Sequence, residues 1–211
     1  MMDYDKDSFF DKKDVSLADC LELLQTPKNT WINIQGIQDV QTIQTIGSHF
    51  KLHPLIMEDI ASSSQRSKLD DYKENLYIVM RILKYNQEKE IVEDEQASII
   101  LGSNYVISFL ESESAIFAPI IKRLQSEESR IRNSGSDYLC YALIDCIVDN
   151  YFGILEQVDQ NLENLEEELV NKPNTKTLIK IQSIKREITH LRKAIWPMRE
   201  VISHFRRIES P

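Results

Sequence analysis

A long run of apolar residues at helical spacing in the second half of the chain strongly limits the possible folds. Between Asp137 and Val170 apolar residues recur every three to five positions, and Gly153 is the one glycine. These residues are Leu139, Leu143, Ile147, Phe152, Leu155, Val158, Leu162, Leu165 and Leu169. The period predicts a single amphipathic helix, which at 1.5 Å per residue is about 50 Å long.

A second helix is predicted directly after this one. Pro173 interrupts the pattern within the polar stretch 171–174, and apolar residues at helical spacing then return. They are Leu178, Ile181, Ile184, Ile188, Leu191 and Ile195. Two long helices joined by a short loop form an antiparallel hairpin, which we assign to residues 136–211. The first arm is rich in Asp and Glu and the second in Lys and Arg, so opposite charges help to set the register.

The first part of the chain, residues 1–135, has a mixed pattern that indicates a separate α/β domain. Strands are expected at 31–34, 76–85, 97–101 and 105–110, and helices at 40–50, after Pro54 and around Pro119. The last two strands flank Gly102-Ser103-Asn104, which is typical of a hairpin. Because strands and helices are grouped and do not alternate, the predicted fold class is α+β, with a mainly antiparallel sheet layered with helices.

Composition excludes several classes of function. With 34 Asp and Glu against 25 Lys and Arg the net charge is -9, which argues against a nucleic-acid partner. No apolar run reaches the roughly 18 residues of a membrane helix, and residues 1–14 do not resemble a secretory signal, so we expect the chain as it stands to be soluble. Cys20, Cys140 and Cys146 form no CxxC pair, which fits a reducing compartment.

An enzymatic function is not predicted. The sequence has no glycine-rich phosphate loop, no nucleophile elbow and no histidine placed as a general base with an evident partner. Cys140 and Cys146 lie on the apolar helix and are expected to be buried structural residues. Trp31 and Trp196 are likewise interpreted as packing residues and not as platforms for a ligand.

Several segments together resemble the CorA family of divalent-cation channels. The most specific is His53-Pro54-Leu55 leading to Glu58-Asp59-Ile60, followed by Gln65-Arg66 and Lys68. Further matching segments are Thr30 to Ile37, Asp137 to Phe152, and Leu191 to Glu200 with its Trp196-Pro197-Met198. The resemblance runs from Thr30 to the end, but the family's Gly-Met-Asn pore signature is absent. It therefore implies the cytoplasmic domain of such a protein, ending before the stalk and transmembrane helices.

The resemblance implies a metal site that is shared between subunits of a homo-pentamer. The acidic pair of the family's short helix falls on Glu58 and Asp59, and an aspartate of its long helix falls on Asp145. Asp149 lies four residues further along the same helical face. The implied ion is Mg²⁺, or else Co²⁺ or another divalent cation. Because the family's main site also uses an aspartate of the stalk helix, the site is expected to be incomplete and weak here.

The residues alone leave a second interpretation of these carboxylates open. An adjacent Glu-Asp pair in a short helix is typical of a solvated face. Asp145 interrupts the apolar row Leu143, Ile144, Ile147 and Val148. A carboxylate beside a core requires a partner, a cap or an ion, and a lysine or arginine of the same chain could serve.

With the resemblance, the chain is expected to sense the metal and to regulate transport. In the full-length form it would face the cytoplasm at the inner membrane, reaching the membrane only through C-terminal helices beyond Pro211. Two alternatives remain: the cytoplasmic domain of a related zinc transporter, or a soluble adaptor that uses the helical hairpin as a docking arm.

Overall fold

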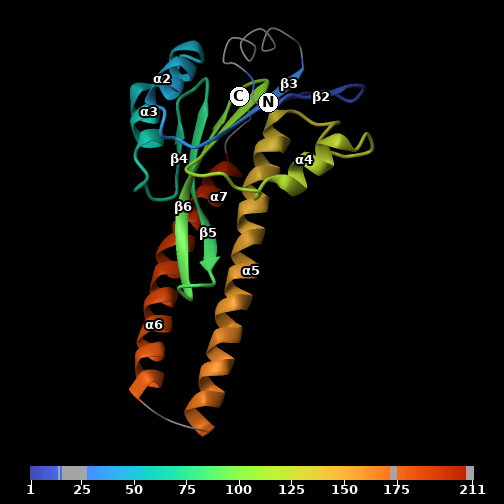
Figure 1. The fold of residues 1–211 in the computed structure, drawn as a ribbon. Coiled ribbons are helices and arrows are strands. Elements are labelled where there is room, and N and C mark those ends of the chain that lie inside the picture. Colours follow the sequence, from blue (N-terminus) through green and yellow to red (C-terminus); the bar gives the residue numbers. More distant parts are fainter. Residues whose placement is uncertain (14, 16–27, 172–174, 208–211) are drawn as a thin grey trace.

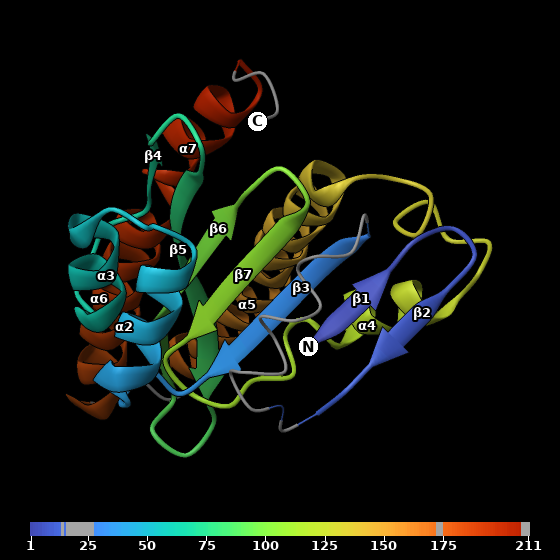
Figure 2. The ribbon, with the colours of Figure 1, turned by 90° about the horizontal axis from the view of Figure 1, so that it is seen from above.

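The computed structural model describes residues 1–13, 15, 28–171 and 175–207. Its centre is a seven-stranded sheet in the order β2-β1-β3-β7-β6-β5-β4, which Figure 2 shows from one edge to the other. The strands are β1 (Met2–Tyr4), β2 (Phe9–Asp11), β3 (Asn29–Gln35), β4 (Lys68–Asp71), β5 (Leu76–Asn86), β6 (Ile91–Leu101) and β7 (Tyr105–Leu110). Every neighbouring pair is antiparallel except β3 and β7, which are parallel. The predicted α+β class with a mainly antiparallel sheet is confirmed.

The helices surround this sheet and then extend well beyond it. They are α2 (Val40–His49), α3 (Pro54–Ala61), α4 (Ala118–Gln125), α5 (Ser136–Asn171), α6 (Thr175–Ile195) and α7 (Met198–Phe205). Figure 1 shows α5 and α6 running in opposite directions as the two arms of a long hairpin, as predicted. Lys180 of α6 lies 2.7 Å from Glu168 of α5, so one pair of opposite charges does join the arms.

The two faces of the sheet carry two separate apolar cores. Alternate residues of a strand point to opposite faces, so Ile78 and Met80 of β5 enter one core while Tyr77 and Val79 enter the other. Helices α2 and α3 cover the second core, and α4 to α7 cover the first. The layers are visible in Figure 1, with α2 and α3 on one side of the strands and α5 on the other.

Helix α5 belongs to the core of the fold. Of the helices in the described residues, it is the one whose length and hydropathy would allow it to cross a membrane. Its buried residues Leu139, Leu143 and Ile147 nevertheless pack in one cluster with strand residues such as Met80. The apolar side that the sequence pattern revealed is therefore used against the sheet. The division into domains 1–135 and 136–211 stays a prediction.

Three strands and part of a fourth escape prediction. Strand β6 begins at Ile91, six residues before the expected start. Its first half was not predicted because residues 93–96 are all polar and do not alternate with apolar ones. These residues pair with β5, for example Glu93 with Lys84 and Gln96 with Arg81. Strands β1, β2 and β4 are only three or four residues long, too short to show a period.

The two tryptophans have opposite environments. Trp31 is fully buried, donates a hydrogen bond from Nε1 to Ser108 Oγ at 3.0 Å, and meets the Phe117 ring edge-on. Its interpretation as a packing residue is correct. The same interpretation of Trp196 is wrong, because 68% of this residue is exposed. Trp196 lies at the break between α6 and α7, where Pro197 interrupts the helix and the side chain projects outward.

The cysteines described by the structure are structural. Cys140 is buried, and burial raises the pKa of its thiol well above the usual value. Cys146 is partly buried and its thiol lies 3.1 Å from the carbonyl oxygen of Ile116. Burial, followed by the negative charges of Asp149 and Asp145, raises the pKa of Cys146 as well. A raised pKa keeps a thiol protonated and unreactive. Cys20 lies outside the described residues.

Candidate functional site

Helix α3 carries the first two candidate ligands, and its start is well defined by the sequence. Pro54 occupies the first turn, where a missing backbone N–H costs nothing. His53 caps the helix, with its Nδ1 accepting a hydrogen bond from the Leu55 amide at 3.3 Å, and its ring stacks on that of Tyr72. Glu58 and Asp59 follow in the second half of this eight-residue helix.

The two acidic residues of α3 have different environments. The Glu58 side chain is exposed, whereas the Asp59 carboxylate is only 15% exposed and accepts a hydrogen bond from Lys68 Nζ at 2.6 Å. Lys68 also lies 2.8 Å from Asp70 on the same strand, β4. Burial lowers the pKa of Lys68, but the hydrogen bonds that its ammonium group donates to Asp59 and Asp70 outweigh burial and leave the pKa raised. The ammonium group therefore stays charged between two carboxylates.

The backbone of the C-terminal half of α3 is held to the sheet by a buried glutamine. Gln96 of β6 donates from Nε2 to the carbonyl oxygen of Asp59 at 2.8 Å. Its Oε1 accepts from the Gln65 amide at 3.2 Å, so one side chain holds both α3 and the loop that follows it. The anchor fixes where Asp59 lies relative to the strands, which a metal ligand requires.

The other two candidates lie on α5. Asp145 is half-buried and Asp149 is exposed. Neither carboxylate has a hydrogen-bond or ion-pair partner within the part of the chain that the structure describes. A carboxylate beside a core is expected to have a partner, a cap or an ion, and the described residues supply no hydrogen-bond or ion-pair partner for Asp145.

The four candidates do not meet within one chain. Glu58 and Asp59 belong to α3 on one face of the sheet, and Asp145 and Asp149 to α5 on the other (Figure 1). Over residues 1–13, 15, 28–171 and 175–207, no three His, Cys, Asp or Glu side chains are grouped so that they could hold a metal ion. A site that uses both pairs therefore needs residues from two copies of the chain.

A second polar cluster was not predicted from the sequence. Asp94 of β6 pairs with Arg81 Nε of the adjacent β5, and its Oδ1 lies 2.9 Å from His190 Nε2 of α6. Arg81 also donates to the carbonyl oxygen of Ser63 at 2.8 Å, which ties in the loop after α3. The available signal was a lone arginine in the apolar strand 76–85, since a buried cation requires a partner.

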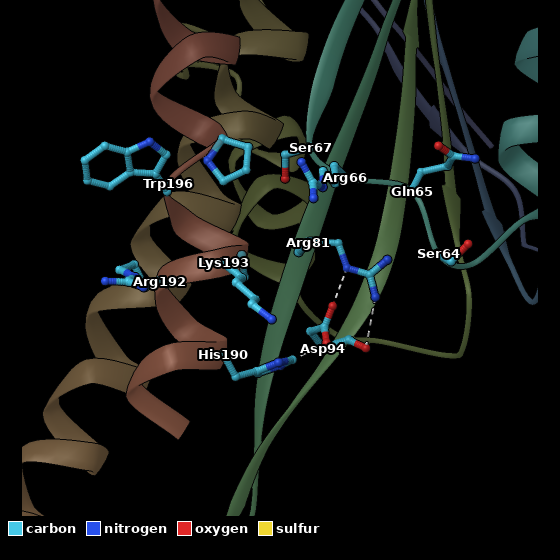
Figure 3. Close-up of a pocket in the computed structure, with 12 residues that line it drawn as sticks. Ser64, Gln65, Arg66, Ser67, Arg81, Asp94, His190, Arg192, Lys193 and Trp196 are labelled. Carbon is cyan, nitrogen blue, oxygen red and sulfur yellow. Dashed lines mark hydrogen bonds and ion pairs between the residues drawn. The ribbon is translucent and has the colours of Figure 1, made fainter. Parts of the chain in front are cut away.

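This cluster forms the floor of a pocket of about 610 Å³. The walls come from three parts of the chain, as Figure 3 shows: the loop 64–67, strands β5 and β6, and the end of α6 with the turn into α7. The lining residues include Arg66, Ser67, Lys193 and Trp196.

Comparison with known proteins identifies the family. The family model of the CorA-like Mg²⁺ transporter protein matches residues 28–211. The chain is 36% identical over all of its 211 residues to the cobalt/magnesium transport protein CorA of Thermotoga maritima. The match covers 60% of that relative, so the chain spans less than two thirds of its length.

Solved structures agree with the fold. The complete CorA magnesium transporter of Methanocaldococcus jannaschii superimposes with a TM-score of 0.78 at 14% identity, covering 100% of this chain and 63% of that one. The soluble domain of the same protein gives 0.75 at 14% identity, covering 100% and 80%. At this identity the likeness concerns the fold alone. The family model and the 36% identical relative together show that the chain belongs to the family of CorA-like Mg²⁺ transporter proteins.

Proposed function

We propose that this chain is the cytoplasmic, metal-sensing regulatory domain of a divalent-cation transporter. The sensed ion is Mg²⁺, with Co²⁺ as the next candidate, because the 36% identical relative is a cobalt/magnesium transport protein. The role is regulatory and not catalytic. In the full-length protein the domain faces the cytoplasm and reaches the membrane only through helices that lie outside this chain.

The observation that carries the proposal is the position of the carboxylates on opposite faces of the sheet. Glu58 and Asp59 lie on α3, while Asp145 and Asp149 lie on α5 and have no partner in the described residues. In a ring of identical subunits, opposite faces of neighbouring copies meet. Such a ring, a pentamer by resemblance to the family, brings α3 of one copy to α5 of the next. Carboxylates from two subunits then share one ion.

The physical role of the ion is to offset repulsion between carboxylates. Two such charges 4 Å apart repel by about 1 kcal/mol in water and about 4 kcal/mol at an effective dielectric constant of 20. Mg²⁺ binds through one or two carboxylates and keeps much of its water, so the sparse ligand set is sufficient. Bound Mg²⁺ holds the ring closed and symmetric, and its loss loosens the ring. Sensing requires that the closed form bind the ion more tightly than the loose form.

Lys68 sets the sensitivity of such a site. In the metal-free chain its ammonium group neutralises Asp59. Metal binding to Asp59 must displace or weaken this ion pair, which for a partly exposed pair costs about 0.2–1 kcal/mol. The cost lowers affinity by up to about fivefold. A weak site is suited to an ion that is present at high concentration.

Sedimentation velocity in chelator and in millimolar Mg²⁺ tests the proposal. We expect Mg²⁺ to increase the fraction of assembled chains, and we expect Asp59→Asn and Asp145→Asn each to reduce that increase. Asp11→Asn, which alters an exposed carboxylate on β2, is the matched control and should leave assembly unchanged. Sedimentation that is identical with and without Mg²⁺ would contradict a sensing role and favour the adaptor. A response to micromolar Zn²⁺ alone would favour the zinc transporter.

A further inference from the structure

The pocket between the loop 64–67 and the α6–α7 turn is separate from the proposed metal ligands. It encloses about 610 Å³, within the range of small-molecule sites. None of Glu58, Asp59, Asp145 and Asp149 lines it. Its lining combines rigid strand residues, Arg81 and Asp94, with residues of the loop and of α6.

The pocket is positively charged in a chain whose net charge is -9. Its lining holds the cations Arg66, Arg81, Arg192 and Lys193 against one carboxylate, Asp94. Arg81 is neutralised by Asp94, and its Nη1 also lies 3.9 Å from Oε1 of Glu111. Arg66, Arg192 and Lys193 have no ion-pair partner in the described part of the chain. A concentration of unneutralised cations in a concave site attracts anions.

A buried hydroxyl group also lacks a partner here. Ser67 is only 7% exposed and lines the pocket, yet its Oγ makes no hydrogen bond in the structure. Most buried polar atoms have a hydrogen-bond partner, and leaving one without costs free energy. The oxygen is almost fully covered by other atoms, so it is not open to a ligand in the pocket, and Ser67 serves below as a control position.

We propose that this pocket binds a multivalent phosphate-bearing anion. Phosphoryl oxygens accept hydrogen bonds from the two charged groups near the centre that have no ion-pair partner in the described residues: the Arg66 guanidinium and the Lys193 ammonium. Arg192 and Trp196 point away from the centre in Figure 3, so Arg66 and Lys193 make the main charged contacts. Because the cavity is larger than one phosphate and holds several cations, it suits a chain of phosphates better than a single ion.

Isothermal titration calorimetry of the 211-residue protein in EDTA tests the proposal without any contribution from metal. The ligands are sodium tripolyphosphate, inorganic phosphate and ATP. We expect tripolyphosphate to bind at least about tenfold more tightly than inorganic phosphate. Equal affinity for ATP and tripolyphosphate would assign recognition to the phosphate chain. Tighter binding of ATP would support the site and add a nucleoside contact.

Paired variants distinguish a built site from general attraction to cations. Arg66→Ala with Lys193→Ala should weaken tripolyphosphate binding by at least about tenfold. Lys122→Ala with Arg123→Ala, which removes one lysine and one arginine from exposed positions of α4, should change it by less than about twofold. Circular dichroism confirms that each variant is folded.

Ser67→Ala is a further control within the pocket lining. It removes a covered hydroxyl that makes no hydrogen bond in the structure, so Tm should not fall and tripolyphosphate binding should change by less than about twofold. Absence of tripolyphosphate binding to the unaltered protein would overturn the proposal. Equal weakening by the pocket pair and the α4 pair would overturn it too.

Discussion

The Lys68 ammonium lies 2.6 Å from the Asp59 carboxylate, so the side chain predicted to bind Mg²⁺ is already neutralised within the chain. The same ammonium lies 2.8 Å from Asp70. Asp145 differs from Asp59 in this respect, because the described residues provide no hydrogen-bond or ion-pair partner for its carboxylate. The internal ion pair is found at the other half of the proposed site.

Replacing Lys68 should strengthen Mg²⁺ binding. In Lys68→Met the ion no longer competes with the ammonium group, and Asp59 and Asp70 repel each other until a cation neutralises them. We expect the Mg²⁺ concentration that gives half-maximal assembly to fall about two- to fivefold, measured by sedimentation velocity. Lys122→Met on α4 is the control. A higher Mg²⁺ requirement in Lys68→Met would show that Lys68 assists the site.

The same ion pair predicts how stability depends on alkaline pH. The folded-state pKa of Lys68 is raised, although burial acts to lower it, because the hydrogen bonds that Lys68 donates to Asp59 and Asp70 favour its charged form. The stabilisation is therefore fully present below the unfolded pKa of about 10.4 and is lost as pH rises through the folded pKa. The Tm difference between the unaltered protein and Lys68→Met should shrink above about pH 10.4. A difference that stays constant would contradict this assignment.

The apolar side of α5 contributes to the stability of the fold through the residues that face the sheet. Leu143 is fully buried, whereas Leu155 on the same helix is 42% exposed. Leu143→Ala should lower the free energy of unfolding by about 2–5 kcal/mol, because it leaves a cavity in the core. Leu155→Ala should cost less than about 1 kcal/mol, since little buried area is lost. Urea denaturation followed by circular dichroism compares the two, and equal losses would contradict the burial argument.

Side-chain hydrogen bonds join α5 to strand β5, among them one from Tyr151. The Tyr151 hydroxyl donates to the carbonyl oxygen of Arg81 at 2.5 Å. Tyr151→Phe keeps the ring but leaves that carbonyl without this donor, and should lower the free energy of unfolding by about 1 kcal/mol. Tyr141→Phe, which alters an exposed tyrosine of α5, should be neutral in the same denaturation experiment. Equal effects of the two substitutions would argue against the hydrogen bond.

Patterns with a local cause were predicted well from the sequence. Helix α5 extends from Ser136 to Asn171 against a predicted run from Asp137 to Val170, because the period of apolar residues is itself the helix geometry. Pro54 marked the start of α3, and Gly102-Ser103-Asn104 marked the β6–β7 hairpin, since both depend on backbone restrictions of neighbouring residues.

Features that depend on residues distant in the sequence could not be predicted from local patterns. The first half of β6 is polar and is a strand because β5 pairs with it. Trp196 comes directly after the apolar pattern that ends at Ile195, and it is exposed because the helix is interrupted at Pro197. The resemblance identified Glu58, Asp59, Asp145 and Asp149 as candidates, but no local pattern could place them on opposite faces of the sheet.

Helices α2 to α6, the longer strands, the fold class and the family resemblance follow from the sequence, because each depends on residues that are close together along the chain. Which charges meet depends on the tertiary structure. Lys68 reaches Asp59 from the strand after α3, and His190 reaches Asp94 across 96 positions of sequence (190 minus 94). Side chains that distant have no common period, and their meeting depends on how the sheet brings whole elements together.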